Sequence, residues 1–123
     1  MQSSVIIDKL QMLYPGKRIS SVPEHKPVEI ICEIDPTSDH REYSIAIAVA
    51  GKSAAHYHLE STEIYEVLIG TLTVFIDGEP HLLEKGDTIT IEPGAIHYVT
   101  GEEAWFRVHS KPGWTEDDHF LVS

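Results

Sequence analysis

Two histidines separated by one residue, His56 and His58, are the side chains of this sequence best suited to chemistry. In a β-strand, residues i and i+2 point to the same face, so the two imidazoles would lie about 6–7 Å apart on one side. Glu63 follows after a short polar turn, and His97 supplies a third imidazole after a Pro-Gly pair. Three imidazoles and a carboxylate that converge on one point form a site for a divalent transition metal ion.

The number of ligands indicates which metal to expect. Four protein ligands would close a tetrahedral zinc site and leave no open position. An octahedral ion with the same four ligands keeps two adjacent positions for water or a bidentate substrate. We therefore expect Mn(II), Fe(II), Ni(II) or Co(II) rather than Zn(II). Two alternatives remain: the four residues face solvent, or they are buried without a metal, which would cost several kcal/mol.

Short extended segments must position these residues. Val28, Ile30, Cys32 and Ile34 alternate with Glu29, Ile31 and Glu33, which is the period of a strand. A helix is expected over residues 4–13, with Ser4 as its N-cap and a Pro-Gly pair after its end. Further strands are expected at residues 43–50, 56–59, 63–69, 71–76, 81–83, 88–91, 97–100 and 104–110. About ten short strands with turns between them are typical of a sandwich or barrel, here a single all-β domain over residues 1–123.

The composition narrows the choice of partners. Nine Lys and Arg against 20 Asp and Glu give a formal net charge of −11, which argues against nucleic acid, because a basic patch is required to bind its backbone. A single cysteine, Cys32, excludes an internal disulfide and fits a reducing compartment. The N-terminus lacks the features of a signal peptide, and no apolar run approaches a membrane span. We expect a cytoplasmic protein that binds a small molecule.

Two segments resemble the signatures of a known family. Residues 51–70 resemble the first signature of the cupins. They contain Gly51, then His56-x-His58, then Glu63 after four residues and Gly70 after six more. Residues 86–97, Gly-Asp-Thr-Ile-Thr-Ile-Glu-Pro-Gly-Ala-Ile-His, resemble the second signature. Two residues depart from the family pattern, and neither is at a ligand position: Glu92 replaces the usual Pro, and Gly101 replaces the usual Asn.

This resemblance implies a fold and a metal site. The expected fold is a double-stranded β-helix, a jelly-roll barrel, here with a short N-terminal helix. Its interior would hold one metal ion on His56, His58, Glu63 and His97. Since cupins are often homodimers, we expect a homodimer. The resemblance does not imply one reaction, since cupins include dioxygenases, decarboxylases, isomerases, epimerases and metal-free sugar binders.

Three residues are candidates for catalysis. Tyr65 lies two positions after Glu63 and faces the same way, so its hydroxyl either serves the site or fills the core. On the strand 104–110, Phe106 and Val108 share the face that periodicity assigns to the core. If the opposite face lines the barrel instead, Arg107 could hold a substrate carboxylate and His109 could act as acid or base.

Together these features favour a metal-dependent enzyme that acts on a small sugar or hydroxy-carbonyl compound through isomerase, epimerase or lyase-type proton transfer. One alternative is an Fe-dependent dioxygenase. Another is a non-catalytic binding or sensing protein. The tail from Trp114 onward is expected to pack on the outside of the barrel or on a partner subunit, rather than to act as a lid.

Overall fold

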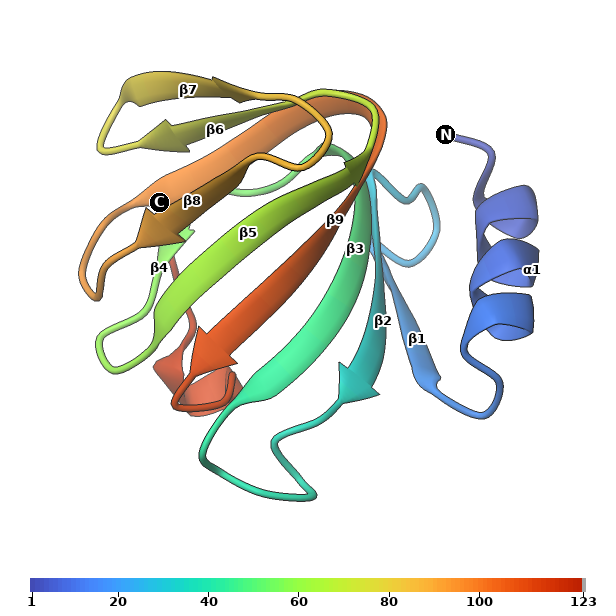
Figure 1. The fold of residues 1–123 in the computed structure, drawn as a ribbon, viewed down its shortest axis with the longest axis horizontal. Helices are drawn as coiled ribbons and strands as arrows, with labels where there is room; N and C mark the ends of the chain where they lie inside the picture. Colours follow the sequence, from blue (N-terminus) through green and yellow to red (C-terminus); the bar gives the residue numbers. More distant parts are fainter. Residues whose placement is uncertain (123) are drawn as a thin grey trace.

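The computed structural model describes residues 1–122 as one curled antiparallel sheet with a helix on its outside (Figure 1). The helical elements are α1 (Ser3–Leu13) and the short 3-10 helix η1 (Glu116–Asp118). The strands are β1 (Arg18–Val22), β2 (Glu29–Asp35), β3 (Ser44–Lys52), β4 (His56–Tyr57), β5 (Thr62–Ile69), β6 (Leu72–Ile76), β7 (Glu79–Leu83), β8 (Thr88–Ile91), β9 (His97–Lys111) and β10 (Phe120–Leu121). The predicted all-β jelly-roll barrel with a short N-terminal helix is confirmed.

Strand β9 organises the barrel, because it pairs with β3, β4, β5 and β6. The sequence predicts two strands, at 97–100 and 104–110, where the structure has this single long strand. Gly101 lies where its first part, which pairs with β6, meets its second part, which pairs with β5. A Cβ at this position would lie 3.0 Å from the carbonyl oxygen of Thr71 and 3.2 Å from the Cβ of Ala104. Glycine therefore permits the close approach of the two chain segments.

Helix α1 covers the outer face of β2 and β3. Its buried residues Ile6 and Leu10 pack on Ile30, Cys32 and Val49, and these residues form the outer core. The predicted helix over 4–13 is confirmed within one residue, but the assignment of Ser4 as N-cap is wrong. The helix begins one residue earlier, after Gln2, and no side chain caps it. Burial of the apolar stripe therefore stabilises this helix more than any cap does.

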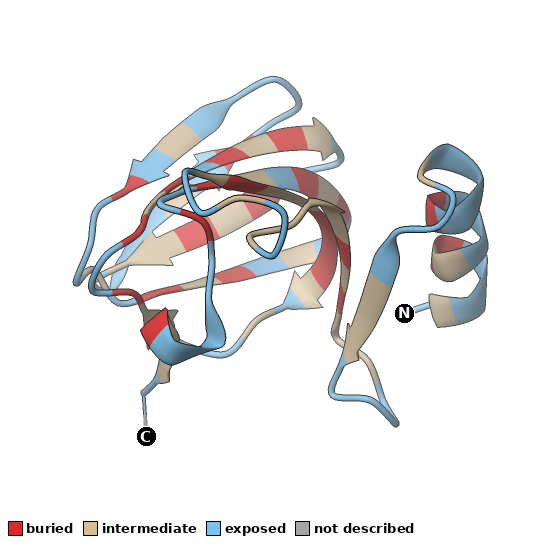
Figure 2. Cartoon of the chain, turned by 90° about the horizontal axis from the view of Figure 1, so that it is seen from below, coloured by how far each residue is buried: buried red, intermediate tan, exposed pale blue. Residues whose placement is uncertain are grey.

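The inner core fills the closed part of the barrel. It is built by inward-facing apolar side chains that include Val67, Leu72, Val74, Val99 and Phe106. Figure 2 shows buried and exposed residues alternating along the curved strands, as expected of strands with one inner and one outer face. Phe106 is buried on β9, which confirms that the apolar face of this strand lines the interior.

Candidate metal centre

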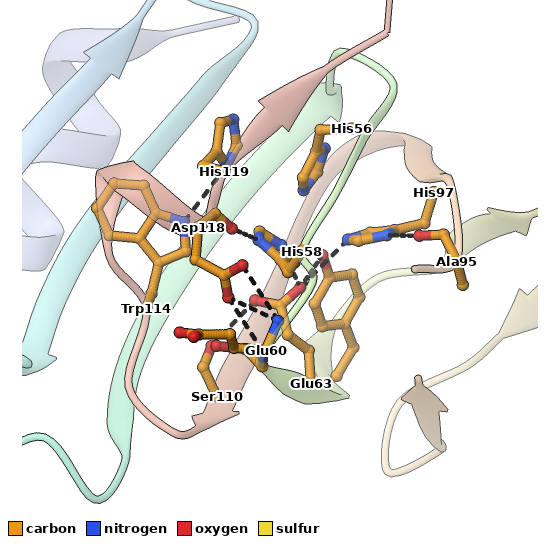
Figure 3. Close-up of polar contacts among 12 residues, drawn as sticks. His56, His58, Glu60, Glu63, Ala95, His97, Ser110, Trp114, Asp118 and His119 are labelled. Atoms are coloured by element: carbon orange, nitrogen blue, oxygen red, sulfur yellow. Dashed lines mark hydrogen bonds and ion pairs between the residues drawn. The ribbon is translucent and has the colours of Figure 1, made fainter. Parts of the chain in front are cut away.

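The four predicted ligands come together inside the barrel. His56 lies on β4, His58 directly follows β4, Glu63 is on β5 and His97 begins β9. Their potential ligand atoms all lie within 4.8 Å of one another, and His58, Glu63 and His97 are buried. Figure 3 shows these side chains pointing toward one another. The structure thus places together four residues that are 41 positions apart in the chain at most, and this cluster could hold a metal ion.

Backbone carbonyl groups orient all three imidazoles. In each ring Nδ1 faces a carbonyl oxygen: Ala54 for His56 at 2.8 Å, Asp118 for His58 at 2.7 Å and Ala95 for His97 at 2.9 Å. A carbonyl oxygen only accepts hydrogen bonds, so each Nδ1 carries the proton. The Nε2 atoms are then free to present lone pairs to the centre of the cluster, as in metal sites where the second ring nitrogen fixes the tautomer.

The carboxylate of Glu63 completes a donor set that needs a cation. Its Oε1 lies 3.1 Å from Nε2 of His58 and 3.2 Å from Nε2 of His97. Its Oε2 accepts a hydrogen bond of 2.9 Å from the hydroxyl of Ser110. With the protons on Nδ1, lone pairs of nitrogen and oxygen face one another, and the buried Nε2 of His58 has no hydrogen-bond partner among residues 1–122. A divalent cation between these atoms would relieve the repulsion, so the donor set fits a metal.

The protonation states also suit metal binding. Burial, reinforced by the neighbouring His97, lowers the pKa of His56 to about 4, so this imidazole is neutral at pH 7. Burial alone would raise the pKa of Glu63, but in the absence of a metal a proton on Nε2 of His58 or His97 holds this pKa well below its usual range, and a metal ion would take the place of that proton. A neutral imidazole and an ionised carboxylate are the forms that bind metal ions, and no proton has to be removed from these two groups first.

Three residues of the cluster, His56, His58 and Glu63, line a cavity of about 420 Å³ inside the barrel. Its walls combine apolar side chains such as Ala48 and Phe106 with the polar residues of the cluster. Cavities of about 300–1,000 Å³ with a few convergent polar groups hold small molecules. The site therefore has room for a compact ligand beside a metal ion.

Tyr65 is the predicted catalytic residue that lines this cavity. It is buried, and its hydroxyl lies 3.5 Å from Oε1 of Glu63, to which it donates a long hydrogen bond. Burial, together with the negative charge of Glu63, raises the pKa of Tyr65 well above 10. The phenol therefore keeps its proton at neutral pH and acts as a hydrogen-bond donor.

Arg107 and His109 do not reach the cluster. The guanidinium of Arg107 pairs with the carboxylate of Glu66, and the imidazole of His109 packs against Tyr43 with ring centroids 5.5 Å apart. Neither residue lines the cavity, because the inward face of β9 carries Phe106 and Val108. The structure therefore does not support the alternative in which Arg107 and His109 serve the site.

The C-terminal segment is part of the site, contrary to the expectation that it packs on the outside. The carbonyl oxygen of Asp118 accepts from His58, and its carboxylate accepts hydrogen bonds from the backbone N–H groups of Leu59, Glu60 and Ser61. His119 stacks on His56 with ring centroids 4.7 Å apart, and both line the cavity. Figure 3 shows Trp114, Asp118 and His119 beside the cluster.

No short-range pattern reveals this contact, because Asp118 lies 60 residues after His58. The one available signal is the type of residue: a tryptophan and a histidine in a polar tail, Trp114 and His119, are unusual for a segment that only covers a surface. Asp118 is buried, and the three N–H groups hold its pKa below the usual range although burial acts in the opposite direction.

Comparison with known proteins identifies the family. The cupin domain matches residues 44–116, more than half of the chain, so this protein belongs to the cupins. An uncharacterized protein of Methanocaldococcus jannaschii is 38% identical over 53 residues, which are 43% of this chain and 42% of that relative. The chain thus spans less than half the length of this relative. Among residues 1–122, no helix has the length and hydropathy that crossing a membrane requires.

Solved structures share the fold at low sequence identity. Streptomyces Pac13, a nucleoside dehydratase, superposes with a TM-score of 0.76 at 14% identity, over 89% of this chain and 87% of that one. KdgF from Halomonas sp. has a TM-score of 0.65 at 16% identity, over 76% and 87% of the two chains. A structure of the DMSP lyases RdDddP and RnDddQII has a TM-score of 0.65 at 20% identity, over 77% and 53%.

Proposed function

We propose that this cupin is a metal-dependent lyase that eliminates a group from a small hydroxy-carbonyl compound by proton transfer. The observation that carries the proposal is the arrangement of the cavity. Three of the four potential metal ligands, His56, His58 and Glu63, line the same cavity of about 420 Å³ as a protonated tyrosine, Tyr65, and the fourth ligand, His97, joins them in the cluster. This combination is what carbon-acid chemistry needs: a cation to stabilise a developing oxyanion and a fixed hydrogen-bond donor beside it.

His56, His58, Glu63 and His97 would hold the metal, which when bound supplies Lewis-acid stabilisation of an enolate-like anion. Tyr65 donates a hydrogen bond to a substrate oxygen, because its pKa keeps the phenol protonated. Ser110 holds one oxygen of Glu63, which leaves the other oxygen directed at the imidazoles. His119 covers the face of His56 and limits the size of the ligand that enters.

Two of the structural neighbours support lyase chemistry over isomerisation. Pac13 is a dehydratase, and the DMSP enzymes are lyases, so both eliminate a group from a substrate. These chains share only 14% and 20% identity with this protein, and a shared fold alone does not transfer an activity. The support for an elimination reaction therefore comes first from the chemistry of the site, and the two neighbours add to it.

The metal is expected to be Mn(II), Fe(II), Ni(II) or Co(II), since four protein ligands leave an octahedral ion two open positions. Elemental analysis of the purified protein tests the metal. The lyase function is tested by incubating protein loaded with each ion with a panel of sugars, keto acids, hydroxy acids and nucleosides. Formation of an unsaturated product supports the proposal. Oxygen consumption that follows iron loading would show a dioxygenase instead, and binding without turnover would show a binding protein.

Tyr65→Phe is the variant that connects the activity to this site. It removes one hydroxyl from a buried ring and leaves the four potential ligands in place. We expect the metal content to stay the same and the turnover to fall by about 10–100-fold, the loss typical of one donor to a developing charge. Full turnover in this variant would exclude Tyr65 from the reaction.

A further inference from the structure

A carboxyl group outside the ligand cluster, Glu29, also lines the cavity. Glu29 lies at the start of β2, opposite Ala50 of β3 in the sheet register. Its neighbour Ile30 points the other way, into the outer core beneath α1. The carboxyl of Glu29 is thus on the barrel side of the strand, and among residues 1–122 no hydrogen bond or ion pair engages it. A carboxyl in a cavity without a structural partner is available for chemistry.

Glu29 is placed so that one small molecule in the cavity could contact both Glu29 and the metal-ligand cluster. Along the sheet, β2 is separated from β5 by β3 and β9, so in the closed barrel the two strands form different walls of one cavity. Glu63 and Tyr65 line the wall formed by β5. A ligand that contacts the metal ligands from one side would therefore have Glu29 on another side.

We propose that Glu29 is the general base and acid of the reaction: it takes a proton from the carbon next to the substrate carbonyl and returns it to the departing hydroxyl. This inference rests on the proposed lyase function. The C–H bond breaks, its electron pair forms the carbon–carbon double bond, and the C–O bond breaks. The hydroxyl leaves as water with the proton that Glu29 carried. Glu29 ends as a carboxylate, so no oxidant or reductant is needed.

The pKa of Glu29 suits both proton transfers, the one in which it accepts a proton and the one in which it donates it. Burial and the nearby charge of Glu63 raise the pKa of Glu29 to about 7. A group with a pKa near the working pH both accepts and donates a proton efficiently. Tyr65, by contrast, keeps its proton and does not act as a base.

The other ionisable groups of the cavity are less suitable. Glu33 lies 3.6 Å from the guanidinium of Arg18, at the open side of the barrel. Glu116 is exposed on η1. His119 is stacked on His56 and covers the ligand cluster. Glu29 is the remaining lining residue; it is half-buried, and its carboxyl has no partner among residues 1–122.

The experiment compares Glu29→Gln with Glu33→Gln, a control four residues along the same face of β2. Each protein is loaded with metal and incubated in D₂O with the β-hydroxy ketone 4-hydroxybutan-2-one, which has exchangeable hydrogens beside its carbonyl. Proton NMR follows both deuterium incorporation and formation of the unsaturated ketone. Metal content and melting temperature are measured in parallel, because Glu29→Gln keeps the shape of the side chain and should preserve the metal content without lowering the melting temperature.

We expect the unsubstituted protein and Glu33→Gln to exchange and eliminate at similar rates, and Glu29→Gln to be slower by about 100-fold or more. If Glu29→Gln retains the rate of the unsubstituted protein, the role of Glu29 is wrong and the lyase function stands. If the unsubstituted protein catalyses neither exchange nor elimination of this probe, both proposals are overturned. Loss of metal in Glu29→Gln would likewise overturn the assignment and make Glu29 a support of the ligand cluster.

Discussion

The two faces of β2 show how one strand serves two different purposes. On the outer face, Ile30 and Cys32 are fully buried beneath α1 and face only apolar neighbours. On the inner face, Glu29 and Glu33 line a cavity that also holds potential metal ligands. The outer face therefore adds stability through burial, while the inner face carries ionisable groups that burial destabilises. The comparison teaches that the apolar face of a barrel strand does not always point inward.

The same contrast separates the two cores of the molecule. The outer core is dry and apolar, and it encloses no ionisable cluster among the described residues. The inner core is apolar at its closed part and polar where His58, Glu63 and His97 are buried. We expect substitutions in the outer core to change stability alone, and substitutions at the polar end to change metal binding as well. The following predictions test that separation.

The largest effect is expected from His58→Ala, which removes a buried ligand. Bound metal content should fall from one ion per chain to nearly none. The free energy of unfolding should fall by about 4 kcal/mol when the metal is present at about 1,000 times its dissociation constant, because an ion that binds only the folded state stabilises it. Elemental analysis and thermal melting with and without chelator measure these effects. A variant that keeps its metal would contradict the assignment of His58.

Leu10→Ala tests the outer core. Leu10 is completely buried between α1 and the sheet, so its truncation should lower the free energy of unfolding by about 3–4 kcal/mol. The metal content of the folded protein should not change, since no residue of the outer core belongs to the cluster. Urea unfolding gives the stability, and elemental analysis gives the metal content. An exposed leucine of another element, Leu82, provides the control, and Leu82→Ala should change stability little.

Glu29→Gln tests the inner face of β2 through pH, in metal-free protein. The folded-state pKa of Glu29 is raised from 4.5 to about 7, so between these values the folded state binds more protons than the unfolded state. The stability of the unsubstituted protein therefore falls as pH rises through this window, by about 3 kcal/mol, at about 1.4 kcal/mol for each pKa unit. The variant lacks this decrease. It should match the unsubstituted protein near pH 4.5 and exceed its stability at pH 8.

The smallest effect is expected from Asp118→Ala, which removes the carboxylate that holds the N–H groups of residues 59–61. We expect a loss of about 1–2 kcal/mol in stability, because these N–H groups, of which that of Ser61 is buried, lose their partner. Metal affinity should also decrease by about 10-fold, since the same segment positions His58. Asp117→Ala is the matched control, because Asp117 is exposed and adjacent. Equal effects of the two substitutions would show that the segment does not support the site.

Much of the site could be predicted from local spacing. His56 and His58 are two residues apart on an extended segment, so the strand period alone puts them on one side. The same strand period places Tyr65 with Glu63, and Phe106 on the inner face of its strand, as the structure confirms. These predictions succeed because they depend on the direction of side chains within a single strand.

The parts that could not be predicted depend on contacts between distant segments. The alternation at residues 28–34 indicated a strand, but whether Glu29 or Ile30 faces the cavity depends on where α1 packs. β1 was not predicted, and its pairing with β2 gives it its extended form. The sequence of the tail predicts a position on the outside, because nothing in it reveals that β10 pairs with β4.

The sequence by itself determined the class of fold and the identity of the candidate ligands, because strand periodicity and the spacing of His56, His58 and Glu63 are local properties of the chain. Only the tertiary structure decided which face of β2 meets the cavity and that Asp118 and His119 complete the site. The physical reason is that a side chain's partner and burial are set by the closure of the barrel, which joins segments 60 or more residues apart.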